Sequence, residues 1–326
     1  MSIVRGPWLP GTLVCALLFG SLPGLRAAGP APVTLGTATV SAQTRAIVIA
    51  PHPDDAALGA GGLIQRILSL GGSVQVVGMT SGDAFSQGIA ALRPATRPTP
   101  ETYRWYGSLR EREDFDALRL LGIRRSRIRL LGFPDDGLCE LARDGIRDAV
   151  FESPYTRRDS PPLEQQVLRG AKYRAADLRL ELENVLLAFR PTLLVVPDPR
   201  DDHPDHCATH LLVHDALELA AVAGLRRPDV LHFLIHARGW PDEAAPQAGG
   251  DDSAWQVFHL TTGERDTKNR AIEAYHSQVS VMATFLHAFE KGDEWFGGPE
   301  RDATAPPCWC RGANIVPRAQ RAQRAQ

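Results

Sequence analysis

Residues 45–72 read RAIVIAPHPDDAALGAGGLIQRILSLGG, and they contain a complete strand–loop–helix unit. After Arg45 the apolar, β-branched run through residue 50 is typical of a buried strand in a parallel sheet. Residues 56–70 have the composition of a helix, which the two following glycines end. Between strand and helix, Pro51-His52-Pro53-Asp54-Asp55 sets carboxylates beside an imidazole. The stretch therefore predicts a buried strand that ends in a chemically active loop.

The alternation of strand and helix continues along the chain. Further strands are predicted over residues 73–79, 129–132, 191–197, 230–236 and 255–260, and helices over residues 109–121, 175–189, 205–223, 268–276 and 281–291. This order predicts an α/β fold, a Rossmann-like and mostly parallel sheet with helices on both faces, formed as a single domain by residues 45–300. Residues 93–100 are expected to form a loop or lid, and residues 148–164 a surface insertion.

A second cluster, Asp202-His203-Pro204-Asp205-His206, follows the strand predicted over residues 191–197. In such sheets ligands bind beyond the carboxyl ends of the strands, where the strand order switches, so the two clusters can meet there. Imidazole and carboxylate groups suit zinc and related divalent cations, and the candidate ligands are His52, Asp55, His203 and His206. Adjacent residues of an extended loop point in opposite directions, which leaves Asp54 to act as a base on bound water.

The motifs at these positions resemble those of the PIG-L/LmbE-like family of zinc-dependent N-acetylglucosamine deacetylases. Pro51–Asp55, Thr80-Ser81-Gly82-Asp83 and His203–His206 each follow a strand in the order that the family shows. The pattern around Arg110 and Glu113 and the segment Ala274–Gln278 fit as well. The resemblance extends over about residues 47–296, which is most of the chain. By itself, the i,i+3 pair Arg110 and Glu113 would be a surface ion pair.

The resemblance implies a role for each matching residue. The metal ligands would be His52, Asp55 and His206, Asp54 would be the general base, and His203 would stabilise the oxyanion. The cofactor would be Zn²⁺ or another divalent metal, and the substrate an N-acetylated sugar or glycoconjugate. Asp202 and Asp205 are expected to fix the tautomers of the imidazoles.

One position departs from the family pattern. The first motif usually continues with glutamate, where this chain has Ala56. Because that glutamate is not a metal ligand, the metal site should persist. Two alternatives stay open: a catalytically impaired, metal-dependent glycan-binding protein, and a metal amidohydrolase for another amide.

Other histidines have simpler interpretations. His210 and His214 follow His206 by one and two helical turns and share its face, but nothing acidic is spaced to complete a second metal site. His232 and His259 are expected in strands as core or edge residues. His236 is expected either to line the pocket or to be buried in the core.

The N-terminus indicates export. Arg5, an apolar stretch over residues 9–22 and a small-residue zone predict a signal peptide over residues 1–27, followed by a lead-in over residues 28–44. We therefore expect a secreted or periplasmic protein with no stable membrane span after processing. Export permits disulfides, but the pairing stays open among four cysteines: Cys139, Cys207, Cys308 and Cys310.

Charge and composition give a further exclusion. The net charge of −2 argues against nucleic-acid binding, which needs a basic stripe. The tail, residues 301–326, contains cysteines and then a basic low-complexity repeat without an apolar face, so a frayed end is expected. The glycines Gly59–Gly62 fall inside the predicted helix and not in a turn, so dinucleotide binding is not expected.

Overall fold

The structure is a computed structural model that describes residues 1–2, 32–36, 38–94, 97–144, 149–237, 239–241 and 255–298. The predicted signal peptide, apart from its first two residues, and the predicted tail lie outside these ranges. Among the described helices, none is long and apolar enough to cross a bilayer.

A seven-stranded sheet forms the centre of the molecule. Its spatial order is β5 (Ile128–Phe133), β4 (Ser73–Thr80), β3 (Arg45–Ala50), β6 (Leu193–Pro197), β7 (Asp229–Phe233), β9 (Asp293–Gly297) and β8 (Trp255–His259). The first five strands are parallel, and β9 pairs antiparallel with both β7 and β8. A small hairpin of β1 (Val33–Leu35) and β2 (Ala38–Val40) precedes it. The prediction of a mostly parallel sheet is therefore confirmed.

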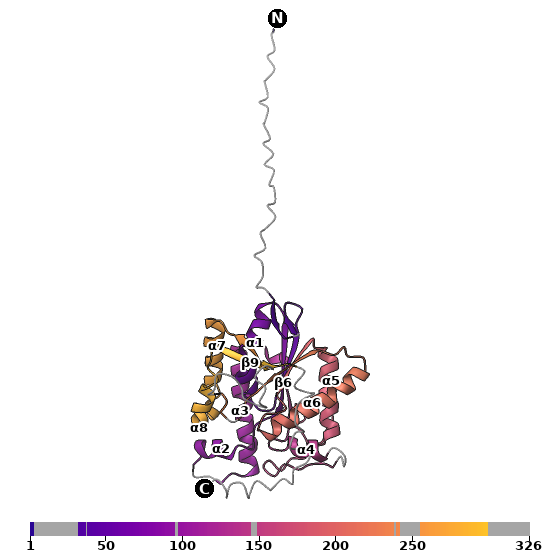
Figure 1. Ribbon diagram of the computed structural model, residues 1–326, viewed down its shortest axis with the longest axis vertical. Coiled ribbons are helices and arrows are strands. Elements are labelled where there is room, and N and C mark those ends of the chain that lie inside the picture. Colours follow the sequence, from indigo (N-terminus) through magenta and orange to yellow (C-terminus); the bar gives the residue numbers. More distant parts are fainter. Residues whose placement is uncertain are drawn as a thin grey trace.

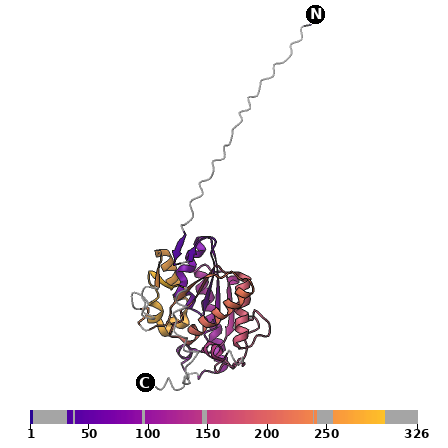
Figure 2. The same cartoon turned by 45° about the vertical axis from the view of Figure 1, so that its right-hand side comes forward.

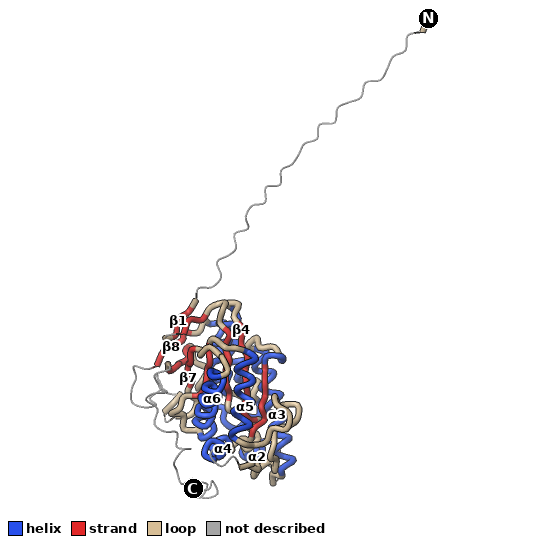
Figure 3. Tube along the Cα trace, turned by 90° about the vertical axis from the view of Figure 1, so that its right-hand side faces the viewer, coloured by secondary structure: helices blue, strands red, loops and turns tan. Residues whose placement is uncertain are grey.

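Helices cover both faces of this sheet (Figures 1 and 3). One face carries α1 (Asp55–Ser69), α3 (Pro100–Leu120), α7 (Thr262–Glu273) and α8 (His276–His287). The other carries α4 (Leu138–Asp144), α5 (Ala175–Phe189) and α6 (Pro204–Val222). Ala46 and Val48 of β3 belong to the first hydrophobic core and Ile47 and Ile49 to the second. Burial on both faces explains why this strand is apolar throughout.

Two predicted boundaries were wrong at the start of a helix. The long helix α3 begins at Pro100 rather than at residue 109, because Thr99 forms a capping box with Thr102 and Pro100 occupies the first turn. The short helix α2 (Ser86–Leu92) precedes it, so the proline-rich segment is a brief connection. Likewise α7 begins at Thr262 rather than at residue 268, after a capping box of Thr261 and Glu264. In both cases the capping residues lie several positions before the predicted start of the helix.

The C-terminal elements also differ from the prediction. Helix α8 covers His276–His287, and β9 follows directly at Asp293–Gly297, where no strand was predicted. The strand's buried residues alternate with half-buried ones, and its short, acidic start gave little signal. Helix α4 and the 3₁₀ turn η1 (Arg125–Arg127) were also not predicted.

The strand order switches between β3 and β6. The chain continues from β3 to β4 on one side and later places β6 on the other side of β3. The loops that follow these two strands therefore meet at the carboxyl edge of the sheet. Figure 2 shows the sheet between its helical layers from a second direction.

Helix α1 is kinked, and a buried ion pair fills the kink. Ala60 has non-helical backbone angles. The Lys268 Nζ group donates to the carbonyl of Leu58 at 2.8 Å and to Glu294 at 2.9 Å, and Glu294 accepts from the backbone N–H groups of Gly62 and Leu63. The backbone groups that the kink releases are thus satisfied.

The first glycine of the α1 run has a packing role. A Cβ at Gly59 would lie 2.5 Å from the ring of Phe233, so a side chain there would push α1 off β7. The glycines lie inside the helix, as the sequence indicated, and none forms a phosphate-binding turn.

Candidate active site

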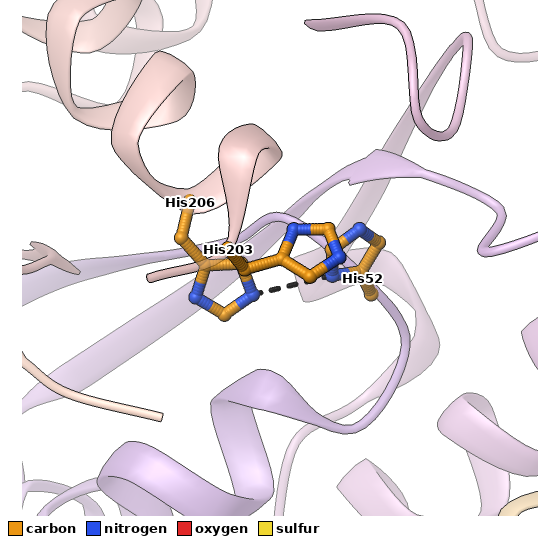
Figure 4. Close-up of side chains that lie close together, drawn as sticks. All are labelled: His52, His203 and His206. Atoms are coloured by element: carbon orange, nitrogen blue, oxygen red, sulfur yellow. Dashed lines mark hydrogen bonds between the residues drawn. The ribbon is translucent and has the colours of Figure 1, made fainter. Parts of the chain in front are cut away.

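The two loops bring three donor atoms into a nearly equilateral triangle. His52 Nδ1 lies 3.4 Å from Asp55 Oδ2, and His206 Nε2 lies 3.2 Å from the same oxygen. The two nitrogens are 3.2 Å apart, and Figure 4 shows the two rings facing each other. Zinc bound tetrahedrally at about 2.0–2.2 Å separates its ligand atoms by about 3.4 Å. The donor set and its spacing therefore fit one divalent cation.

The outer ring nitrogens of both histidines face carboxylates. His206 Nδ1 lies 3.0 Å from Asp201 Oδ2, and His52 Nε2 lies 3.2 Å from Asp135 Oδ1 and 3.5 Å from Asp205 Oδ2. Histidines that bind metals commonly hold a carboxylate in this way, which fixes the tautomer and the ring orientation. The expectation for Asp205 thus agrees with its position.

Asp202 does not support an imidazole, contrary to the prediction, because its side chain is exposed. The neighbouring residue Asp201 takes that position, and it also accepts hydrogen bonds from the backbone N–H groups of His203, Ile235 and His236. Burial alone raises the pKa of Asp201, but His206 and these donors outweigh it and lower the pKa below its usual value. Adjacent aspartates in a loop give no sequence signal that tells which one turns inward.

Asp205 also stabilises a second element. Its carboxylate accepts from the backbone N–H groups of Asp136 at 2.7 Å and Leu138 at 3.1 Å, at the start of α4. Asp135, from the same turn, contacts His52 and accepts from the N–H of Ala84 at 2.6 Å. Asp135 and Asp136 follow β5, and the sheet topology brings this turn to the site.

The electrostatics of this region favour a positive charge. Burial lowers the pKa of His52, but the carboxylates of Asp135, Asp205 and Asp55 outweigh burial and raise it well above its usual value. Burial likewise raises the pKa of Asp55, yet His206 and His52 bring it well below its usual value. Buried carboxylates gathered around two imidazoles provide the negative environment that a divalent cation requires.

Asp54 has a strained backbone and a shifted pKa. Its φ of 114° and ψ of −35° lie outside the regions that non-glycine residues favour, and such strain concentrates at functional sites. Burial raises the pKa of its carboxyl group to about 7, although Arg110 opposes the shift. A carboxylate with a pKa near the working pH is suited to general base catalysis.

Arg110 holds this loop in place. Its Nη2 donates to Asp54 Oδ2 at 3.0 Å and to the carbonyl of Pro53 at 2.7 Å, and its Nη1 donates to the carbonyl of Gly82 at 2.9 Å. The interpretation of Arg110 and Glu113 as a surface ion pair was wrong, because both are buried and they face different partners. Glu113 accepts from the N–H and hydroxyl of Ser277 at 2.9 and 2.6 Å.

The segment that resembled the family near the C-terminus packs against α3. Tyr275 donates its hydroxyl to Asp114 Oδ1 at 2.8 Å, and Gln278 Nε2 lies 2.6 Å from the hydroxyl of Tyr106. Burial raises the pKa of Asp114 to about 7. These contacts anchor the helix that carries Arg110, and Gln278 itself lines the pocket.

His203 begins α6 as its N-cap. Its Nδ1 accepts from the backbone N–H of Asp205 at 3.2 Å, so the neutral ring carries its proton on Nε2. Burial, followed by the nearby His52 and His206, lowers the pKa of His203 well below its usual value. A neutral imidazole with an N–H at the pocket wall can donate to an oxyanion, which is the role expected for it.

A cavity of about 230 Å³ opens at these groups. Its polar wall includes Asp54, Asp55 and His203, and its apolar wall includes Phe85, Ile235, Met282 and Phe285. Of the two positions that the sequence left open for His236, the structure shows the pocket wall, and the ring stacks on Phe285 with centroids 5.3 Å apart. Burial lowers the pKa of His236 to about 4, so this ring is neutral near pH 7.

Three positions in or beside the sequence motifs lie near the pocket without lining it. Ala56, in the first turn of α1, is 1% exposed and packs in the hydrophobic core, so it is not part of the pocket wall. Thr80 donates its hydroxyl to the carbonyl of Pro51 at 2.9 Å, which fixes the loop that carries His52. Asp83 is half-buried and does not line the cavity, and the burial of its carboxyl group raises its pKa well above the usual value.

Comparison with known proteins places these motifs in a family. The sequence profile described as "PIG-L: GlcNAc-PI de-N-acetylase" matches residues 47–217. A 1D-myo-inositol 2-acetamido-2-deoxy-alpha-D-glucopyranoside deacetylase from Corynebacterium kroppenstedtii is 29% identical over 205 residues, 62% of this chain and 43% of that protein. A diacetylchitobiose deacetylase from Thermococcus kodakarensis is 25% identical over 195 residues, 58% of this chain and 55% of that protein. The chain thus matches about half the length of these relatives.

Solved structures share the fold. A conserved protein from Thermus thermophilus has a TM-score of 0.50 at 23% identity, over 84% of this chain and 98% of that one. A 4-carboxy-2-hydroxymuconate hydratase from Pseudomonas putida has a TM-score of 0.51 at 15% identity, over 77% of this chain and 93% of that one. Since one of these folds carries a hydratase, the activity of this chain must be argued from its site.

Proposed function

The chain belongs to the PIG-L (GlcNAc-PI de-N-acetylase) family, and from this premise we propose that it is a metal-dependent hydrolase that removes acetyl from an N-acetylglucosamine-type sugar or glycoconjugate. The observation that carries the proposal is the triangle of His52 Nδ1, Asp55 Oδ2 and His206 Nε2 with the carboxylate of Asp54 beside it. Two deacetylases of N-acetylated sugars among the relatives support this substrate class.

Each residue of the site has a defined part in the reaction. His52, Asp55 and His206 would hold the divalent metal, for which we propose zinc, and that ion supplies an acidified water and a Lewis acid when bound. Asp54 accepts the proton of the attacking water and returns it to the leaving amine.

Two further residues act on geometry and charge. Arg110 orients the Asp54 carboxylate and, through its positive charge, keeps the pKa of that group from rising further. His203 donates its Nε2–H to the oxyanion that develops on the amide carbonyl. Acetate and a free amine are the products.

The decisive experiment is an amine-release screen. The purified protein is loaded with zinc and incubated with N-acetylglucosamine, its oligomers and N-acetylglucosamine linked to inositol. Release of amine that Asp54→Asn abolishes, with zinc content unchanged, supports the proposal. Zinc-dependent sugar binding without any amine release would instead support the glycan-binding alternative, which Ala56 motivates. Release from other acetylated amides alone would support the second alternative.

Export is a further part of the proposal. It is supported by the leader pattern in the sequence and by Cys139 and Cys207, which are both disulfide-bonded in the structure. Disulfides persist in oxidising compartments. An exported enzyme would meet extracellular or cell-envelope glycans as its substrates. Cys308 and Cys310 lie outside the described residues. Mass spectrometry of the mature protein purified from its native host tests the cleavage, with a new N-terminus near residue 28 as the expected result.

A further inference from the structure

A second group of histidines lies along the same helix as the catalytic candidates. His210 and His214 of α6 face His232 of β7, and one ring nitrogen from each residue lies within 4.8 Å of the others. The ring centroids are 4.4, 5.4 and 6.2 Å apart. His210 is 5% exposed and His232 is fully buried, while His214 is half-buried. We call these three residues the second histidine cluster.

The orientation of His232 suits a metal ligand. Its Nδ1 lies 3.1 Å from the carbonyl oxygen of Gly298, and since a carbonyl can only accept, Nδ1 carries the proton. In the neutral ring the lone pair is then on Nε2. A backbone carbonyl that holds the outer nitrogen of an imidazole is the same supporting arrangement that carboxylates give to metal-binding histidines.

We propose that the second histidine cluster binds a divalent transition metal, zinc in the first instance, and thereby fastens α6 to β7. The i,i+4 spacing places His210 and His214 on one helix face, and His232 of β7 supplies the third imidazole from the face of the sheet that α6 covers. Three imidazoles favour zinc, nickel or copper over magnesium and calcium, which prefer oxygen ligands. From the sequence alone this site lacked a third ligand, because His232 joins the helix only through the tertiary structure.

The site is independent of the proposed catalytic centre. The ligands of the two sites are different residues, although His206 and His210 lie one turn, about 6 Å, apart on α6. The second histidine cluster consists of three imidazoles and lines no part of the cavity at the catalytic candidates. Its expected contribution is therefore stability, through a metal that binds the folded state only.

Metal stoichiometry tests this proposal. Protein stripped with a chelator is reloaded with zinc, desalted and analysed by inductively coupled plasma mass spectrometry, with folding checked by circular dichroism. We expect roughly two zinc ions per wild-type chain and roughly one in each of the single variants His214→Gln and Asp55→Asn. The double variant that combines these two substitutions should bind none. His214 is chosen because it is only half-buried, and His259→Gln, at an exposed histidine of β8, is the matched control that keeps both ions.

Each outcome decides one site. Zinc content unchanged in His214→Gln overturns the second site, and so does a wild type whose only zinc disappears in Asp55→Asn. Loss in His287→Gln instead would assign the ion to the exposed group Glu273, His287 and Glu290. Retention of two ions in Asp55→Asn would speak against the catalytic centre and leave this proposal intact. As a second measurement, zinc should raise the Tm of Asp55→Asn and leave the Tm of the double variant unchanged.

Discussion

The loop after β3 and the loop after β6 both end at a helix N-terminus and both supply metal-ligand candidates, yet they are held in different ways. The first loop has a strained Asp54 that residues distant in sequence secure, with Arg110 from α3 and Thr80 from β4. The second loop is regular: His203 is an extended N-cap, and Asp201 from the same loop fixes it and His206.

The difference separates two tasks. The first loop positions the proposed general base Asp54, and its geometry depends on Arg110 and Thr80, which can be substituted without changing a proposed metal ligand. The second loop must orient an imidazole, and its geometry depends largely on one carboxylate. We therefore expect changes at Asp54 and its supporting partners to reduce turnover with metal retained, and changes at Asp201 to reduce metal affinity.

The largest effect should come from Asp54→Asn. An amide cannot take the proton, so kcat for amine release should fall by about 10²–10⁴-fold. Zinc content should stay at the wild-type level, because Asp54 is no ligand in this account. The matched control is Asp202→Asn, an exposed aspartate of the other loop, which should keep full activity. Equal losses in both variants would contradict the assignment of the base.

Asp201→Asn tests the loop after β6, where we expect the affinity for zinc to change. Loss of the negative partner of His206 Nδ1 should weaken zinc binding by about 10–100-fold, as measured by competition with a chromogenic chelator. At saturating zinc, kcat should recover most of its wild-type value. A variant that binds zinc normally but turns over slowly would show that Asp201 does not serve the ligand.

Arg110 should tune the base. In Arg110→Met the positive charge beside Asp54 is lost, so the pKa of that carboxyl group rises and the acid limb of the pH–rate profile moves to higher pH. Arg110→Lys keeps the charge but not the fork of hydrogen bonds, and kcat should fall by roughly tenfold with a smaller pH shift. An identical pH profile in both variants and the wild type would exclude this electrostatic role.

The smallest effect belongs to a region outside both loops. Burial raises the pKa of Glu264, but Arg66 at 2.6 Å, with help from Thr261, outweighs burial and lowers it below its usual value. The ionised carboxylate therefore stabilises the fold above its unfolded-state pKa of about 4.3, and this stability is lost as pH falls through the folded-state pKa.

Glu264→Gln should therefore cost about 1 kcal/mol or less at pH 7, and the difference from wild type should shrink at pH 3. Urea unfolding at the two pH values measures it. Amine release per folded molecule should be unchanged, which makes this variant a reference for those in the loops. A cost that grows towards pH 3 would contradict the sign of the effect.

The sequence allowed prediction of the sheet and of the residues that gather at its edge. Strands such as β3 are continuous apolar runs, and proline-bearing His/Asp loops after two of them can meet only if the strand order switches there. The residues that support the ligands were harder to foresee. Asp201 and Asp202 are adjacent aspartates, and only the tertiary structure shows that the side chain of Asp201 is the buried one. The spacing of Arg110 and Glu113 indicated a surface ion pair, but α3 packs against the loop and buries Arg110. The proximity of His232 to His210 and His214 could not be predicted from the sequence, because it depends on how α6 packs against the sheet.

The loops after β3 and β6 together build one metal centre, with Asp54 beside it. Diffraction data collected from crystals of the zinc-loaded protein on both sides of the zinc absorption edge test it most directly. We expect an anomalous peak about 2.0–2.2 Å from His52 Nδ1, Asp55 Oδ2 and His206 Nε2, with no direct contact to Asp54. A peak ligated by Asp54, or no peak between these two loops in zinc-loaded crystals, would contradict it.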